Sequence, residues 1–131
     1  MLAVAATLAV TGCTSGTPAE PSTDVASPPN PVFVMNRYSA GDLAAMITES
    51  GLPLPHAHDV SRRDCPVIRC TDKIESDTVS VMTFRSSGVA ELHAGLTDHS
   101  FQLFNVVMVF NPTVNADQKR AYEDVVTHAI Q

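Results

Sequence analysis

Residues 101–110 read FQLFNVVMVF, the most apolar stretch of this 131-residue chain and the one that decides its fold. Alternate side chains of an extended segment point to opposite faces. One face then carries Leu103, Val107 and Val109, and the other carries Phe104, Val106, Met108 and Phe110. Because both faces are apolar, the stretch predicts a strand in the interior of a sheet, where each face can be covered.

A sheet that is packed by helices on one side only would leave one of these two faces without cover. Other parts of the chain would then have to fold over that face. We expect partial cover with a residual apolar groove, which would act as a binding surface. The candidate binding residues are Phe104, Val106, Met108 and Phe110.

Three helices are predicted by N-capping residues that precede apolar side chains at helical spacing. The predicted N-caps are Ser39, in a capping box with Asp42, then Ser87, and finally Asn115, in a capping box with Gln118. Gly51 ends the first helix, and the prolines after it predict irregular or extended backbone up to Val60. Residues 78–84 alternate and are rich in Val and Thr, which is typical of a strand.

This order of elements predicts a single α+β domain over residues 32–131. The expected architecture is a small two-layer sandwich, with a short sheet of about three strands packed by helices. Residues 13–31 contain five of the nine prolines and no apolar periodicity, which predicts a disordered linker rich in Pro, Ser and Thr ahead of the domain.

Residues 1–12 contain no charged side chain and are mostly aliphatic, which is typical of the apolar region of a signal peptide. They lead directly into Val10-Thr11-Gly12-Cys13, which resembles the lipobox of bacterial lipoproteins. The resemblance implies cleavage after Gly12, acylation of Cys13 and a membrane anchor outside the cytoplasmic membrane. The basic residues that usually open such a signal are absent before Arg37, so we expect the natural start to lie upstream. The alternative is an apolar helix packed on the domain.

The other two cysteines lie five residues apart in Asp64-Cys65-Pro66-Val67-Ile68-Arg69-Cys70. This spacing resembles a disulfide-closed loop of an exported domain, and an oxidising compartment would permit the bond. A redox site would normally be Cys-x-x-Cys, and a zinc site would need a second pair of ligands. A structural disulfide between Cys65 and Cys70 is therefore the favoured interpretation.

Charge and composition narrow the classes of function. The chain has 14 acidic and 8 basic side chains, a formal net charge of −6, which argues against nucleic acid as a partner. No apolar run reaches the roughly 18 to 20 residues that a membrane-spanning helix needs. No glycine-rich phosphate-binding loop is present, and the sequence predicts no cofactor.

Few side chains have the spacing of a catalytic or metal site. His56, His58 and Asp59 are weak candidates for metal ligands, and they would serve a small metal-dependent or hydrolytic enzyme of the cell envelope. An exposed loop is the simpler interpretation of the same residues. Ser87 lies in a Ser-Ser-Gly sequence that lacks the Gly-x-Ser-x-Gly pattern of a nucleophile elbow. The sequence therefore predicts no catalytic residue.

The chain as a whole resembles small exported lipoproteins of mycobacteria and related actinobacteria. The similar features are the linker, the Cys-x4-Cys loop, a strand ending in Phe84, a helix with Val89-Ala90, and a strand before Pro112 followed by a Tyr-bearing helix. The resemblance implies an envelope location and carries over no functional residue except Cys13. We expect a non-enzymatic binding domain that contacts an envelope protein or a lipid-like ligand. A phage-derived lipoprotein that blocks superinfection is a further alternative.

Overall fold

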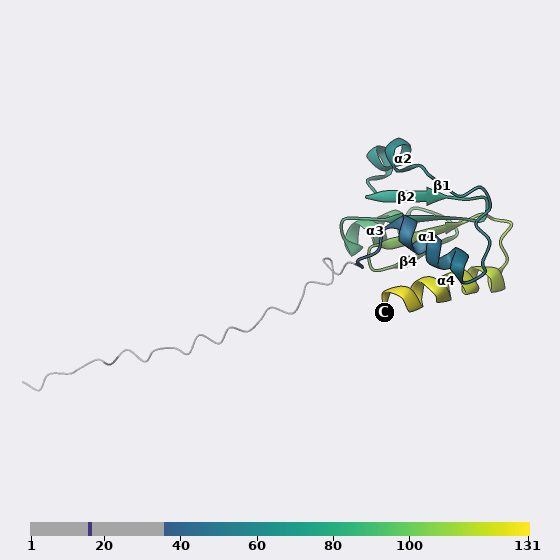
Figure 1. The fold of residues 1–131 in the computed structure, drawn as a ribbon. Helices are drawn as coiled ribbons and strands as arrows, with labels where there is room; N and C mark the ends of the chain where they lie inside the picture. The colour runs from purple at the N-terminus through teal and green to yellow at the C-terminus, as the bar shows by residue number, and fades with distance from the viewer. Residues whose placement is uncertain (1–15, 17–35) are drawn as a thin grey trace, which may run out of the picture.

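The computed structural model describes Gly16 and residues 36–131 (Figure 1). The predicted signal peptide (1–12), Cys13 and, apart from Gly16, the predicted linker (13–31) lie outside the described residues.

The described residues form an α+β domain, as predicted. Its helices are α1 (Ala40–Glu49), α2 (Ser61–Ile68), α3 (Ser87–Gly95) and α4 (Ala116–Ile130). Its strands are β1 (His58–Asp59), β2 (Asp72–Glu75), β3 (Val79–Thr83), β4 (Ser100–Leu103) and β5 (Val106–Phe110). All strand pairs are antiparallel, in the order β1-β2-β3-β5-β4. The prediction of about three strands is wrong, because β1 and β2 lack an apolar alternation and residues 101–110 form two strands.

Residues 101–110 are a hairpin rather than one strand. Leu103 pairs with Val106, and Phe104 and Asn105 form the turn between β4 and β5. Phe104 has a φ of 51°, a conformation that bulky residues rarely adopt, and no glycine signals the turn in the sequence. The interior position predicted for this stretch holds for β5, which lies between β3 and β4.

The first face of the sheet packs against α1 and α4. Their apolar side chains share one buried cluster with β3 and β5, and its largest members are Leu43, Ile47, Val79, Val81, Val106, Met108, Phe110, Tyr122 and Val126. Both helices begin with the predicted capping boxes, Ser39 with Asp42 and Asn115 with Gln118. Each box satisfies backbone N–H groups that the first helical turn leaves without an internal partner.

The second face is covered by α3 and by the end of α2. Met82, Phe84, Ala90 and Val107 form its buried cluster, against which Ile68 and Cys70 pack. The predicted two-layer arrangement is therefore wrong, since helices lie on both faces of the sheet. The N-cap of α3 is Ser86 rather than Ser87, because Ser86 has extended backbone and its side chain accepts a hydrogen bond from the N–H of Val89.

This double cover corrects the predicted binding surface. Val106 and Met108 are 0% exposed and Phe110 is 3% exposed, so these three candidates are core residues under α1 and α4. Phe104 is half-buried in the hairpin turn. On the opposite face, Val107 is also fully buried. The prediction of an apolar groove along β5 is wrong, because helices on both faces of the sheet bury its side chains.

Asn105 connects the hairpin turn to two distant segments. Its side-chain amide donates to the carbonyl of Phe84 (3.1 Å), and its side-chain oxygen accepts hydrogen bonds from the backbone and side-chain nitrogens of Asn36 (2.7 and 2.9 Å). The backbone carbonyl of Asn105 accepts from the N–H of Phe84 at 2.8 Å. Asn105 is 3% exposed, so water cannot readily replace these partners.

We expect Asn105→Ala to lower the free energy of unfolding by about 1–3 kcal/mol, because it leaves buried polar groups without partners. Urea denaturation monitored by circular dichroism measures the loss. Asn111→Ala is the control, since Asn111 is exposed and its side chain accepts only from Thr113. Equal losses for the two variants would contradict the role of Asn105.

Candidate functional site

The predicted metal candidates are directed to separate partners. Nδ1 of His56 lies 2.6 Å from a carboxylate oxygen of Asp77, whereas Nδ1 of His58 donates to the carbonyl of His56 at 2.7 Å. Asp59 accepts a hydrogen bond from the N–H of Ser61. Among residue 16 and residues 36–131, no three His, Cys, Asp or Glu side chains are grouped so that they could hold a metal ion. The arrangement gives His56, His58 and Asp59 no common site.

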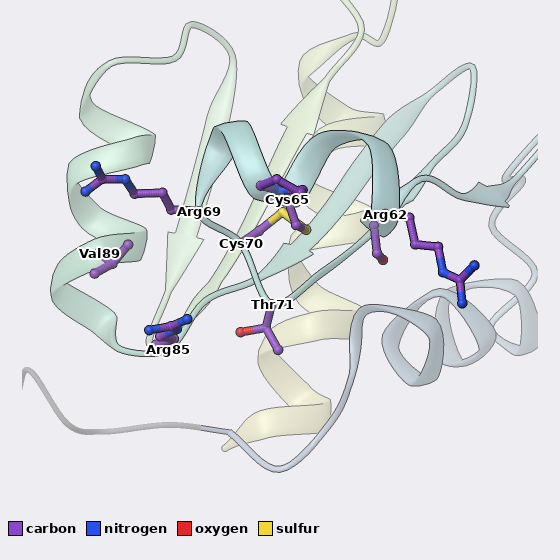
Figure 2. Close-up of a pocket in the computed structure, with 9 residues that line it drawn as sticks. Arg62, Cys65, Arg69, Cys70, Thr71, Arg85 and Val89 are labelled. Carbon is purple, nitrogen blue, oxygen red and sulfur yellow. A yellow bond between two sulfur atoms is a disulfide. The ribbon is translucent and has the colours of Figure 1, made fainter.

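A cavity in the described part of the chain lies instead between α2, the loop after it and the start of α3 (Figure 2). Its volume is about 740 Å³, within the range of about 300 to 1,000 Å³ typical of small-molecule sites. The lining residues are Ser61, Arg62, Cys65, Pro66, Arg69, Cys70, Thr71, Arg85 and Val89. This cavity is the candidate functional site.

The helical period of α2 explains which of its side chains line the cavity. Positions 61, 62, 65, 66 and 69 share one side of the helix, since successive residues turn by about 100°. Cys65 is buried on this side and forms a disulfide with Cys70. Arg69 ends the helix with a φ of 68°, and its N–H donates to the carbonyl of Cys65 at 2.7 Å. The disulfide and this turn together fix the place of Arg69 at the cavity wall.

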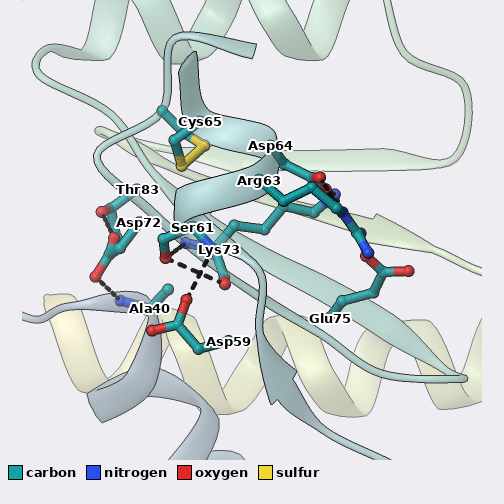
Figure 3. The surroundings of a disulfide bond; sticks show 11 residues. Ala40, Asp59, Ser61, Arg63, Asp64, Cys65, Asp72, Lys73, Glu75 and Thr83 are labelled. Carbon is teal, nitrogen blue, oxygen red and sulfur yellow. Dashed lines mark hydrogen bonds and ion pairs between the residues drawn. A yellow bond between two sulfur atoms is a disulfide. The ribbon is translucent and has the colours of Figure 1, made fainter. Parts of the chain in front are cut away.

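A charged cluster between α2 and β2 holds α2 in position (Figure 3). Nζ of Lys73 lies 2.7 Å from Asp64, and Arg63 contacts both Asp64 (2.6 Å) and Glu75 (3.0 Å). Hydrogen bonds from Arg63 and Lys73 hold the pKa of the Asp64 carboxyl well below its usual value. The side-chain oxygen of Ser61 also accepts from the backbone N–H of Lys73 (2.8 Å). Arg63 and Lys73 are therefore committed to carboxylates.

The opposite wall comes from the end of β3 and the start of α3. Arg85 follows Phe84, whose buried ring lies 5.3 Å from the imidazole of His93. Burial lowers the pKa of His93, so this histidine is favoured as a neutral packing residue of α3. Figure 2 shows the Arg69 and Arg85 side chains on either side of Val89.

The electrostatic character of the cavity differs from that of the chain as a whole. Arg62, Arg69 and Arg85 are exposed, and none forms an ion pair with a carboxylate of the described residues. Although the chain has 14 acidic side chains, none of those in residues 36–131 lines this cavity. A cavity of about 540 Å³ between α1 and α4, by contrast, includes Glu49 and Asp124.

Arginine clusters of this kind are suited to anions. The guanidinium group is planar, permanently charged and able to donate two parallel hydrogen bonds to a carboxylate or a phosphate. Arg85 lies 16 residues after Arg69, and the three arginines follow no motif, so the sequence did not predict this cluster. The one sequence signal was the position of two of them, because Arg62 precedes the Cys65–Cys70 loop and Arg69 lies within it.

A comparison of the chain with protein-family models, with curated proteins and with solved structures found no match in any of the three. None of the helices in the described residues is long and apolar enough to cross a membrane. The function of the cavity is therefore inferred from the residues that line it.

We expect Cys65 and Cys70 to resist alkylation until a reductant is added, as mass analysis of the purified protein can show. Reduction should cost about 2 kcal/mol of stability, because it releases the short loop in the unfolded chain, and lower the melting temperature by several degrees. Treating a Cys65→Ser/Cys70→Ser variant with the same reductant controls for nonspecific effects and should leave its melting temperature unchanged. Two thiols that react without reductant, in protein from an oxidising compartment, would contradict this pairing.

Proposed function

We propose that this chain is a lipid-anchored protein of the cell envelope whose folded domain binds an anionic group in the arginine-lined cavity. Binding, and not catalysis, is the function of the domain. The single observation that carries this proposal is that Arg62, Arg69 and Arg85 all line one open cavity, whose lining among the described residues includes no carboxylate.

The distribution of charge supports anion binding. Three of the eight basic side chains line this one cavity, although the net charge of the chain is −6. At physiological ionic strength charges are screened over about 8 Å, so a bound group responds mainly to the charges around it. Arg62 also acts on Asp59, whose pKa is lowered by hydrogen bonds from Ser61 and further by the Arg62 charge. Arg69 and Arg85 are the principal anion-binding residues.

The other lining residues support a binding role over a catalytic one. The two cysteines are joined in the disulfide, and the Ser61 oxygen is engaged with the backbone of Lys73. The lining includes neither a histidine nor a carboxylate that would serve as a general base beside a nucleophile. Thr71 supplies a hydroxyl group, which suits hydrogen bonding to an anion.

The N-terminal sequence supports the location. Val10-Thr11-Gly12-Cys13 resembles a lipobox, and residues 13–31 have the composition of a linker. A proline-rich linker extends by about 3.1 Å per residue, so it would hold the domain within about 50 to 60 Å of an anchor at Cys13. The domain would lie on the outer face of the cytoplasmic membrane, where a disulfide is stable.

Titration of the protein with inorganic phosphate and pyrophosphate, followed by NMR, tests anion binding. We expect the largest amide shifts at Arg69, Thr71 and Arg85. Arg69→Gln and Arg85→Gln should each weaken pyrophosphate binding by about tenfold, because a hydrogen bond to a charged group is worth about 1.5–3 kcal/mol.

Arg120→Gln is the matched control for this titration, since Arg120 is an exposed residue of α4 outside the cavity lining. It removes the same charge and should leave the affinity unchanged. Equal weakening by all three substitutions, or no binding by the unsubstituted protein, would overturn the proposed site.

Acylation at Cys13 is tested separately. Expressed in bacteria with a basic segment restored before Met1, the protein should partition into the detergent phase and carry acyl chains detectable by mass spectrometry. Cys13→Ser should abolish acylation and leave an uncleaved precursor, because the thiol is the acylated group. A wild-type protein that remains fully in the aqueous phase would contradict the predicted anchor.

A further inference from the structure

Large apolar side chains are exposed on the two helices that border the cavity. Among the described residues, the exposed large hydrophobic side chains are Val67 (84% exposed), Leu92 (66%) and Leu96 (81%). Val67 belongs to α2, Leu92 belongs to α3, and Leu96 is the C-cap of α3. Each exposed aliphatic side chain costs free energy in water, and all three belong to the helices that border the arginine-lined cavity.

The helical period directs these side chains away from the sheet. In α2, Cys65 is buried and Ile68 packs on the second face of the sheet, so Val67 projects from the outer side. In α3, Ala90 is fully buried, and Leu92 projects outward. Figure 2 shows both helices on the same side of the sheet, with α4 on the far side.

Charge on this outer surface is predominantly positive around the cavity. Arg62, Arg69 and Arg85 are exposed there. Two carboxylates are exposed close to the leucines in sequence, Glu91 of α3 and Asp98 two residues after Leu96, so the three arginines outnumber them. The α2–α3 surface, defined as Val67, Leu92 and Leu96 with these three arginines, therefore combines cationic groups with protruding aliphatic groups. An anionic bilayer surface presents the complementary chemistry.

The place where the chain enters the domain bears on how a linker could present this surface. Asn36, the first residue of the described domain, hydrogen bonds to Asn105, which in turn hydrogen bonds to Phe84. Arg85 is the next residue. Asn36 also lines a small cavity with Ala129 and Ile130 of α4, so the chain enters the domain at the edge between its two helical layers. A linker that starts at a membrane anchor would therefore allow the α2–α3 side to reach the bilayer.

We propose that the α2–α3 surface docks onto the anionic lipid bilayer that holds the anchor. Arg62, Arg69 and Arg85 bind lipid phosphate groups, while Val67, Leu92 and Leu96 insert among the headgroups. This inference rests on the proposed function, because it identifies the anionic group of the cavity as a lipid headgroup.

Because the predicted linker of residues 13–31 would keep the domain close to the membrane, even a weak affinity for lipid would keep the surface bound. A domain tethered by a short flexible chain experiences an effective concentration in the millimolar range. A surface with millimolar affinity for lipid would then be occupied for a large part of the time. The orientation of the anchored domain follows, with α1 and α4 facing away from the membrane.

Vesicle sedimentation of the full chain carrying Cys13→Ser tests the docking surface without the acyl anchor. The probes are phosphatidylcholine vesicles with and without phosphatidylglycerol. We expect binding to require phosphatidylglycerol and to weaken as salt rises. Arg69→Gln and Arg85→Gln should each reduce the partition coefficient by about fivefold, and Leu92→Ser/Leu96→Ser should reduce it by about tenfold.

Controls in this assay separate the surface from other contributions. Arg120→Gln, on α4, should bind like the parent protein, and melting temperatures confirm that each variant is folded. Residues 1–12 have no charged side chain and lie outside the α2–α3 surface, so binding through them would not respond to the arginine and leucine substitutions.

Three results would overturn the docking surface. The first is equal binding to both kinds of vesicle, and the second is binding that none of the arginine and leucine substitutions reduces. The third is a dimer, seen in sedimentation velocity, that Leu92→Ser/Leu96→Ser dissociates. Such a dimer would assign the surface to a second copy of the chain. Retained pyrophosphate binding without vesicle binding overturns this inference alone. Loss of pyrophosphate binding with retained vesicle binding overturns the soluble-anion site of the proposed function instead.

Discussion

Both faces of β5 carry apolar side chains, and the need to cover them shapes the rest of the domain. Val106, Met108 and Phe110 pack under α1 and α4, whereas Val107 packs under α3. Two helices, α1 and α4, cover the first face, while α3 and the end of α2 cover the second. The arginine-lined cavity lies between α2 and α3 on the second side. The candidate site thus lies between the two helices that cover one face of a two-sided strand.

The short helix α2 depends on contacts outside itself. It has eight residues, contains Pro66, and contributes only Cys65 as a buried side chain. An isolated helix of this length is unstable in water. The Cys65–Cys70 disulfide and the ion pair between Asp64 and Lys73 therefore stabilise it from two sides. These same restraints position Arg62 and Arg69, so a single set of contacts fixes both the fold of α2 and one wall of the site.

The sequence predicts those elements whose signal is local. Capping boxes predict α1 and α4, and β-branched alternation predicts β3, because each pattern lies within a few residues. By contrast, β1 and β2 are half-exposed strands without an apolar pattern, and α2 forms through the long-range restraints described above. The turn at Phe104 is imposed by pairing of β4 with β5 against local preference. The cavity could not be predicted either, since only the packing of α2 near α3 brings Arg69 and Arg85 together.

The separation of charge between the two layers gives the domain a direction. The acidic residues Glu49 and Asp124 line the cavity between α1 and α4, while the arginines line the cavity between α2 and α3. The net charge of −6 alone would indicate that the protein is repelled by any anionic surface. Salt screens charges over about 8 Å, so the charges on the side of the domain nearer to that surface have the larger effect. A protein with a net negative charge can therefore attract an anionic surface through its α2–α3 side. Repulsion between that surface and the α1–α4 side disfavours approach from the other direction.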